Sequence, residues 1–208
     1  VIPDSLKDSI KNGQAVLCLG AGASIGAKDS FSKNIVNGND LKDLLCDKFL
    51  GGKYKDRSLE QVAGFSMSET SQGEVEQFIR EILEKFEPAD FHLILPTFRW
   101  KTIYTTNYDL IIEKAYKKQT KRVQNLLPIV DNQSSTRDNN SLYYIKLHGC
   151  ITRSSDISLP MILTSKQFIE CEQNRDKLYA RLNTDAYDYP IIFIGHSLQD
   201  NDLLEIIN

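Results

Sequence analysis

The sequence predicts an α/β fold, in which helices cover both faces of a Rossmann-like parallel sheet. Several segments that read as strands are continuously apolar, most clearly AVLCLG at residues 15–20. Strands of this kind are typical of parallel sheets that are buried on both faces. They alternate with segments of helical periodicity, which favours helix layers around a sheet. A length of 208 residues with 41% hydrophobic content is enough for a domain with its own core.

The first expected elements are a helix, a strand and a second helix. The helix covers residues 3–12, because a proline stands at its start and Asn-Gly at its end. The apolar run at 15–20 reads as a buried strand. Apolar residues then recur at helical spacing over 40–50, and two glycines end that pattern.

The middle of the chain is mostly helical. Residues 74–86 have helical spacing with acidic residues leading. Asp90 can cap a helix over 91–98, although a proline in this segment should end or kink it. Residues 101–107 are β-branched and aromatic, which predicts a strand, and 108–118 return to helical spacing.

The last third alternates again between strands and helices. Its expected elements are an extended segment over 122–130, an exposed loop over 131–141, strands over 142–149 and 160–164, a helix capped by Thr164 or Ser165, a strand over 189–198 and a final helix from 200.

The helical stretch from about 40 to 100 is long for a connection between two strands. We therefore expect a helical insertion or small subdomain over one edge of the site. Residues 1–208 are expected to form one domain. We also expect them to be the N-terminal part of a longer protein, because the chain stops in an apolar helical pattern.

Composition argues against several classes of protein. A net charge of −3 does not suit a general nucleic-acid binder, and the basic run at 117–122 is better explained as a solvated helix end. The apolar runs are shorter than the ~20 residues of a membrane helix. With no signal peptide, we expect a cytoplasmic protein. The four cysteines form no C-x-x-C pair, which predicts no zinc module and no metal site.

Four polar or glycine-rich clusters stand where expected strands end. They are Gly20, Ala21, Gly22, Ala23 and Ser24; Thr106, Asn107, Tyr108 and Asp109; His148 and Gly149; and Gly195, His196 and Ser197. Ligands of open parallel sheets bind at the carboxyl ends of the strands, so we expect these clusters to share one site.

Each cluster also has a purely structural interpretation. The glycines of the first cluster suit either a tight turn or a cradle of backbone N–H groups for a pyrophosphate. Asn107 and Asp109 suit helix caps as well as a ligand site. His148 can act as a general base near neutral pH. His196 is the rival base, and His92, in an amphipathic helix, is expected to be structural.

Taken in order, the clusters resemble motifs of the sirtuin family. GAGAS (20–24) looks like its first nucleotide-binding motif, TTNYD (105–109) its asparagine–aspartate motif, LHG (147–149) its catalytic histidine motif and GHSL (195–198) its late glycine–serine motif. The chain lacks the paired zinc cysteines of sirtuin deacylases, and it reads IGAKDSF where they have a phenylalanine–arginine pair. In its motifs it looks more like the sirtuin-like NAD hydrolases of bacterial antiphage defence.

The resemblance implies an NAD+ nucleosidase that releases nicotinamide and ADP-ribose, with NAD as substrate and no true cofactor. His148 would be the base, Asn107 would position water and ribose, and Asp109 would hold the nicotinamide carboxamide. The phosphates and adenine ribose would lie against residues 20–24 and 195–197. Further domains, a homo-oligomer and a phage trigger or regulatory protein are also implied. The alternatives are a silent sensor of NAD or ADP-ribose and a zinc-free protein deacylase.

Overall fold

The computed structural model describes residues 2–132, 141–154, 156 and 159–196. Its centre is a five-stranded sheet in the order β3-β4-β2-β1-β5, and every neighbouring pair is parallel. The strands are β1 (Val16–Leu19), β2 (Ile103–Thr105), β3 (Asn125–Ile129), β4 (Ser141–Lys146) and β5 (Ile191–Ile194). The predicted α/β fold with a Rossmann-like parallel sheet is confirmed.

Alternate residues of β1 face two separate helix layers. The helices beside the sheet are α1 (Asp4–Lys11), the 3-10 helix η2 (Asp90–Thr97), α5 (Ile111–Lys118) and α6 (Ser165–Asp188). Leu17 and Leu19 pack in a core that includes residues of α1, η2 and α5, whereas Val16 and Cys18 pack with residues of α6. Because both faces of the strand are covered, its side chains are apolar at every position.

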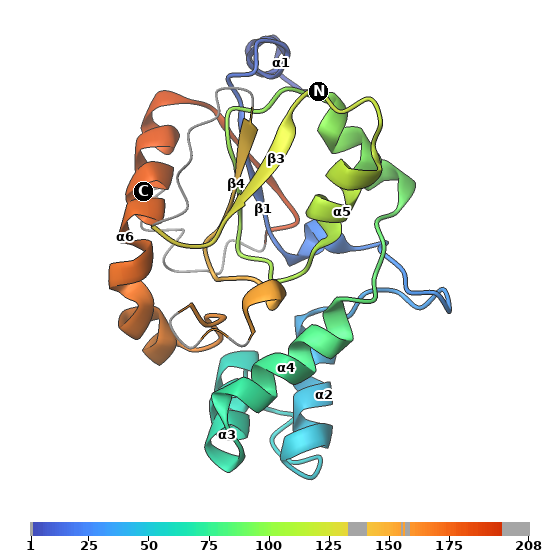
Figure 1. The fold of residues 1–208 in the computed structure, drawn as a ribbon, viewed down its shortest axis with the longest axis vertical. Helices are drawn as coiled ribbons and strands as arrows, with labels where there is room; N and C mark the ends of the chain where they lie inside the picture. Colours follow the sequence, from blue (N-terminus) through green and yellow to red (C-terminus); the bar gives the residue numbers. More distant parts are fainter. Residues whose placement is uncertain (1, 133–140, 155, 157–158, 197–208) are drawn as a thin grey trace.

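Three helices between β1 and η2 form a helical subdomain. They are α2 (Gly38–Phe49), α3 (Leu59–Glu69) and α4 (Gln72–Leu83). Figure 1 shows them gathered below the sheet. Asn37 and Ser58 cap α2 and α3 in capping boxes. The core of the subdomain includes Leu45 and Ile79 and continues into the main domain at Ile111. The expected insertion is present, and it ends before η2, which packs on the sheet.

One predicted strand is wrong. Residues 160–164 carry no strand pairing. Met161 and Leu163 are instead buried in the core of the helical subdomain, and the Ile162 N–H donates to the His148 carbonyl oxygen at 2.9 Å. Packing of this segment between the two parts of the fold replaces pairing at a sheet edge.

The helix caps agree in part with the sequence. Thr164 caps α6 by accepting from the Gln167 N–H, as expected. Asp90 does not cap η2, because the chain enters that helix at Ala89, whose N–H donates to His92 Nδ1. Most of the expected loop at 131–141 and the final helix from 200 lie outside the described residues. None of the helices described is long and apolar enough to cross a membrane.

Candidate functional site

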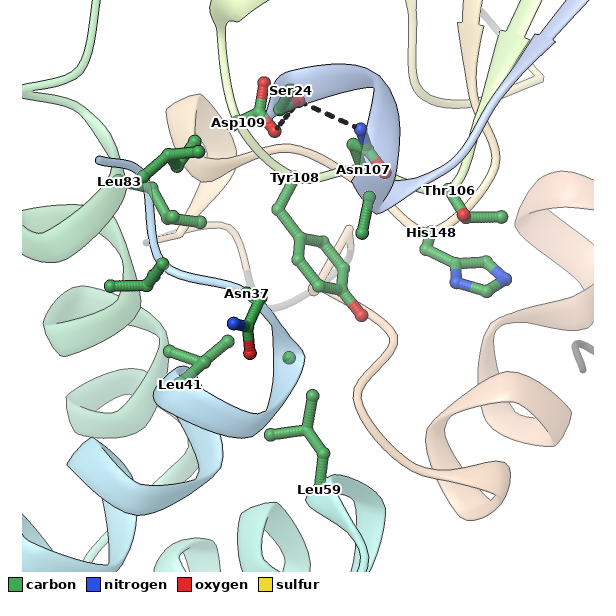
Figure 2. A pocket seen from close by; sticks show the side chains of 14 residues that line it. Ser24, Asn37, Leu41, Leu59, Leu83, Thr106, Asn107, Tyr108, Asp109 and His148 are labelled. Carbon is green, nitrogen blue, oxygen red and sulfur yellow. Dashed lines mark hydrogen bonds between the residues drawn. The ribbon is translucent and has the colours of Figure 1, made fainter. Parts of the chain in front are cut away.

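A pocket of about 220 Å³ lies between the carboxyl ends of the central strands and the helical subdomain. Figure 2 shows Ser24, Asn107 and Asp109 on one side of it and Leu41 and Leu59 on the other. The lining residues come from the first turn, the loop after β2, the end of β4 and the subdomain: Ala21, Ser24, Ile35, Val36, Asn37, Gly38, Leu41, Leu59, Leu83, Thr106, Asn107, Tyr108, Asp109 and His148.

A buried hydrogen-bond network joins the first turn to the loop after β2. The Asn107 Nδ2 group donates to the Gly20 carbonyl oxygen at 2.9 Å and to Ser24 Oγ at 3.2 Å. Ser24 Oγ donates in turn to Asp109 Oδ2 at 2.7 Å, as the dashed lines of Figure 2 mark. Asp109 Oδ1 accepts from the Ile111 N–H at 2.9 Å. Asp109 therefore supports the start of α5 and also lies in the pocket wall.

His148 reaches the same pocket from the neighbouring strand. It is half-buried and follows β4 after one residue, Leu147. Gly149 allows the chain to turn at this point with φ +89°, and a Cβ there would lie 2.9 Å from the Pro160 carbonyl oxygen. The absence of a side chain at Gly149 thus lets the chain pass close to the backbone at Pro160, directly after His148 in the pocket wall.

The glycines of the first turn agree with the tight turn that was one of their two predicted roles. The N–H groups of Gly20 and Gly22 donate to the carbonyl oxygens of Ile194 and Gly195, at 3.0 and 2.8 Å. A Cβ on Gly20 would lie 2.6 Å from the Gly195 carbonyl oxygen, and one on Gly22 would lie 2.7 Å from Gly195 Cα. These glycines are required because the turns after β1 and β5 pack backbone against backbone. Their two N–H groups already have partners inside the protein.

His92 supports the first turn from outside the pocket. Its Nδ1 accepts from the Ala89 N–H at 2.9 Å, so the proton lies on Nε2, which donates to the Ala23 carbonyl oxygen at 2.9 Å. Burial lowers the pKa of His92 and favours this neutral form. The ring fixes the turn, in agreement with the structural role expected from the sequence.

The predicted site residues fall into three groups. Ala21, Ser24, Asn107, Asp109 and His148 line one pocket. The second group adjoins it without lining it and consists of Gly20, Gly22, Ala23, Gly195 and His196. Ser197 lies outside the described residues.

The sequence missed the wall that the helical subdomain contributes. Asn37 was detectable as a helix start, since Asn-x-x-Asp at 37–40 is a capping pattern, but not as a pocket residue. Lys146 was detectable as a charged residue inside an apolar strand, and it is fully buried. Within the ranges that the structure describes, no three His, Cys, Asp or Glu side chains come together as metal ligands.

A five-stranded parallel sheet with a pocket at its carboxyl edge, lined by polar residues of the strand ends and apolar residues of the subdomain, defines a Rossmann-like α/β domain. The chain belongs to the SIR2-like domain family, whose model matches residues 101–208.

The chain also aligns with curated relatives. The chain is 24% identical over 210 residues to the NAD(+) hydrolase ThsA of Bacillus cereus (strain MSX-D12), and 26% identical over 212 residues to that of Enterococcus faecium. Each alignment covers 100% of this chain and 42% of the relative. A third, the NAD(+) hydrolase ThsA of Acinetobacter baumannii (strain 532279), is 30% identical over 135 residues, which are 64% of this chain and 27% of the relative. The chain thus spans about two fifths of the length of the relatives that align with all of it.

Proposed function

We propose that this chain is the catalytic domain of an NAD glycohydrolase, which cleaves NAD to nicotinamide and ADP-ribose. The observation that carries the proposal is the single pocket that holds His148 together with Asn107 and Asp109 at the carboxyl ends of adjacent parallel strands. The relatives named NAD(+) hydrolase support the choice of substrate.

NAD cleavage depends on the arrangement of the pocket more than on a general acid. Nicotinamide is attached to the ribose as a cation and leaves as a neutral molecule, so no strong general acid is needed. The enzyme must orient a water molecule and stabilise a ribose that gains positive charge. His148 would act as the base toward the water or the ribose hydroxyls, a role that typically contributes ~10²–10⁴-fold. Asn107 would position the water and the ribose.

Asp109 would hold the carboxamide of nicotinamide. Each of its oxygens has one partner, the Ser24 hydroxyl or the Ile111 N–H. A carboxylate oxygen can accept a second hydrogen bond, so the carboxamide N–H has an acceptor without loss of the network.

The size of the pocket suggests how NAD would lie. About 220 Å³ is less than the ~300–1,000 Å³ of pockets for drug-sized ligands, so it suits the nicotinamide and ribose alone. The phosphates would lie near Ala21 and Ser24, and the adenosine half would extend toward residues 195–197. Full binding would then require the helical subdomain to move away from the strand ends, which would keep the rate of NAD cleavage low before a trigger acts.

The wider role follows from the resemblance to antiphage NAD hydrolases. The protein would act in the cytoplasm, where it would deplete NAD after phage infection. Further domains of the same chain, a homo-oligomer and a phage-derived or regulatory trigger are part of this proposal. No membrane or nucleic-acid partner is proposed for this domain.

The test is to incubate the native protein with NAD and to separate the products by chromatography. Equal amounts of nicotinamide and ADP-ribose are expected from NAD alone. Binding of NAD without any release of nicotinamide would favour the silent sensor. Release that requires an acylated peptide would favour the deacylase.

A further inference from the structure

One buried charge beside the pocket has no part in the mechanism above. Lys146 is the last residue of β4, two residues before His148, and its side chain is 0% exposed. A buried ammonium group is unfavourable unless its three N–H donors all find acceptors. The contacts of this side chain therefore show what it does in the fold.

The acceptors of Lys146 come from the segment that follows β2. Nζ lies 2.9 Å from Glu113 Oε1 in the first turn of α5. It also donates to the carbonyl oxygen of Asp109 and, at 3.5 Å, to that of Tyr108. Burial acts to lower the pKa of Lys146, but the Glu113 carboxylate outweighs it with the help of other nearby groups, so the pKa is raised. A raised pKa favours the charged form of this side chain in the folded protein.

These contacts connect the two halves of the proposed active site. The loop whose carbonyl oxygens Lys146 binds is the loop that carries Asn107 and Asp109. Lys146 itself belongs to the strand that presents His148, and it is paired with Thr105 of β2. The Lys146 side chain thus connects β4, which presents the proposed base His148, to the loop that carries Asn107.

We propose that Lys146 is a positioning residue for the reaction in this pocket. Its ammonium group fixes the carbonyl oxygens of Tyr108 and Asp109 and so holds Asn107 at its working distance from His148. The proposal rests on NAD hydrolysis as the proposed function. Glu113 is the counterion that allows a cation at this buried position.

The test needs a variant that removes both charges. Lys146→Met alone would leave Glu113 buried without its cation, and such a protein can fail to fold. The double variant Lys146→Met/Glu113→Gln removes the ion pair together with the contacts to the loop. Tyr104→Phe is the control, because it breaks another buried hydrogen bond, the one from β2 to Asp185 of α6 at 2.7 Å.

Two measurements test the proposal: the kinetics of nicotinamide release and amide hydrogen exchange. Both are made on the wild type and the variants in the native full-length protein, at a temperature where all of them are folded. Misplacement by about 1 Å costs about 10²-fold in rate, so kcat for nicotinamide release should fall about 10–100-fold in the double variant. KM should change less than about threefold, and Tyr104→Phe should keep both constants. Amide hydrogen exchange over residues 106–110 should be faster in the double variant and unchanged in the control.

Each result then decides a separate question. A double variant with the kcat of the wild type, or with unchanged exchange at 106–110, would show that Lys146 serves only the core and would overturn the proposal. If the wild-type protein released no nicotinamide, the proposed function would fail. The exchange comparison would still show whether Lys146 holds the loop.

Discussion

Glu76 in α4 is a buried carboxyl group whose ionisation should make the stability of the protein depend on pH. Its side chain is buried, with the residue 2% exposed, and its Oε1 accepts from Gln72 Nε2 at 2.9 Å. Burial raises its pKa to about 7, although hydrogen bonds from Gln72 and the Met161 backbone and the Arg175 guanidinium act to lower it. The folded protein therefore keeps this carboxyl group protonated at a pH where the unfolded chain does not.

The sign and size of the effect follow from this difference. Between pH 4.5 and pH 7 the unfolded chain has released the proton of Glu76, while the folded protein still holds it. The free energy of unfolding therefore falls as the pH rises through this window, by roughly 1.4 kcal/mol per unit. Over the whole window the loss is about 3 kcal/mol.

The Glu76→Gln variant should remove this dependence, because an amide has no proton to lose. In urea titrations, the stability of the variant relative to wild type should be about 3 kcal/mol more favourable at pH 7.5 than at pH 4.5. Glu74→Gln, which changes an exposed residue of the same helix, should show no such trend. If Glu76→Gln and wild type kept a constant difference across this range, the inferred ionisation of Glu76 would be refuted.

Three further predictions concern two glycines, His92 and metal. Gly195→Ala should destabilise the protein by about 2–4 kcal/mol, because its Cβ would lie 2.0 Å from the Ala23 nitrogen at φ +68°. Gly73→Ala, where no described atom lies within 4 Å of the added Cβ, should instead stabilise it by up to about 1 kcal/mol; urea titrations test both. Burial lowers the pKa of His92, so its contribution to stability is complete above about pH 6.5 and is lost as the pH falls below that value. The difference in the free energy of unfolding between wild type and His92→Gln should therefore shrink from pH 7.5 to pH 5. Because no cysteines have ligand spacing, elemental analysis should find no stoichiometric zinc, and one zinc per chain would contradict this.

Much of the fold could be predicted from local patterns. The continuous apolar run at 16–19 indicated a strand that is covered on both faces, and the structure places helices on both sides of it. The polar residues after β2 and β4 were recognisable as a site because parallel strands present their carboxyl ends at one edge. This rule predicts that Asn107, Asp109 and His148 lie close together, and the structure shows that they line one pocket.

The remaining features depend on contacts between distant segments. Gly22 meets Gly195 because β5 pairs with β1, and no local pattern encodes that strand order. The segment at 160–164 has the composition of a strand, but its apolar side chains are buried by the helical subdomain instead. The pocket wall at Leu41 and Leu59 likewise depends on where the subdomain lies. Only the tertiary arrangement reveals these roles.

In the proposed function, one pocket binds NAD and His148 is the base for its cleavage. The most direct measurement compares NAD affinity by calorimetry with nicotinamide release for wild type, His148→Ala, Asn107→Ala and His196→Ala. We predict that His148→Ala and Asn107→Ala abolish release while their NAD affinity changes by less than about tenfold, or roughly 1.4 kcal/mol. His196→Ala should retain turnover. Loss of turnover in His196→Ala, with full activity in His148→Ala, would contradict the assignment of the base and the alignment with sirtuin motifs on which it rests.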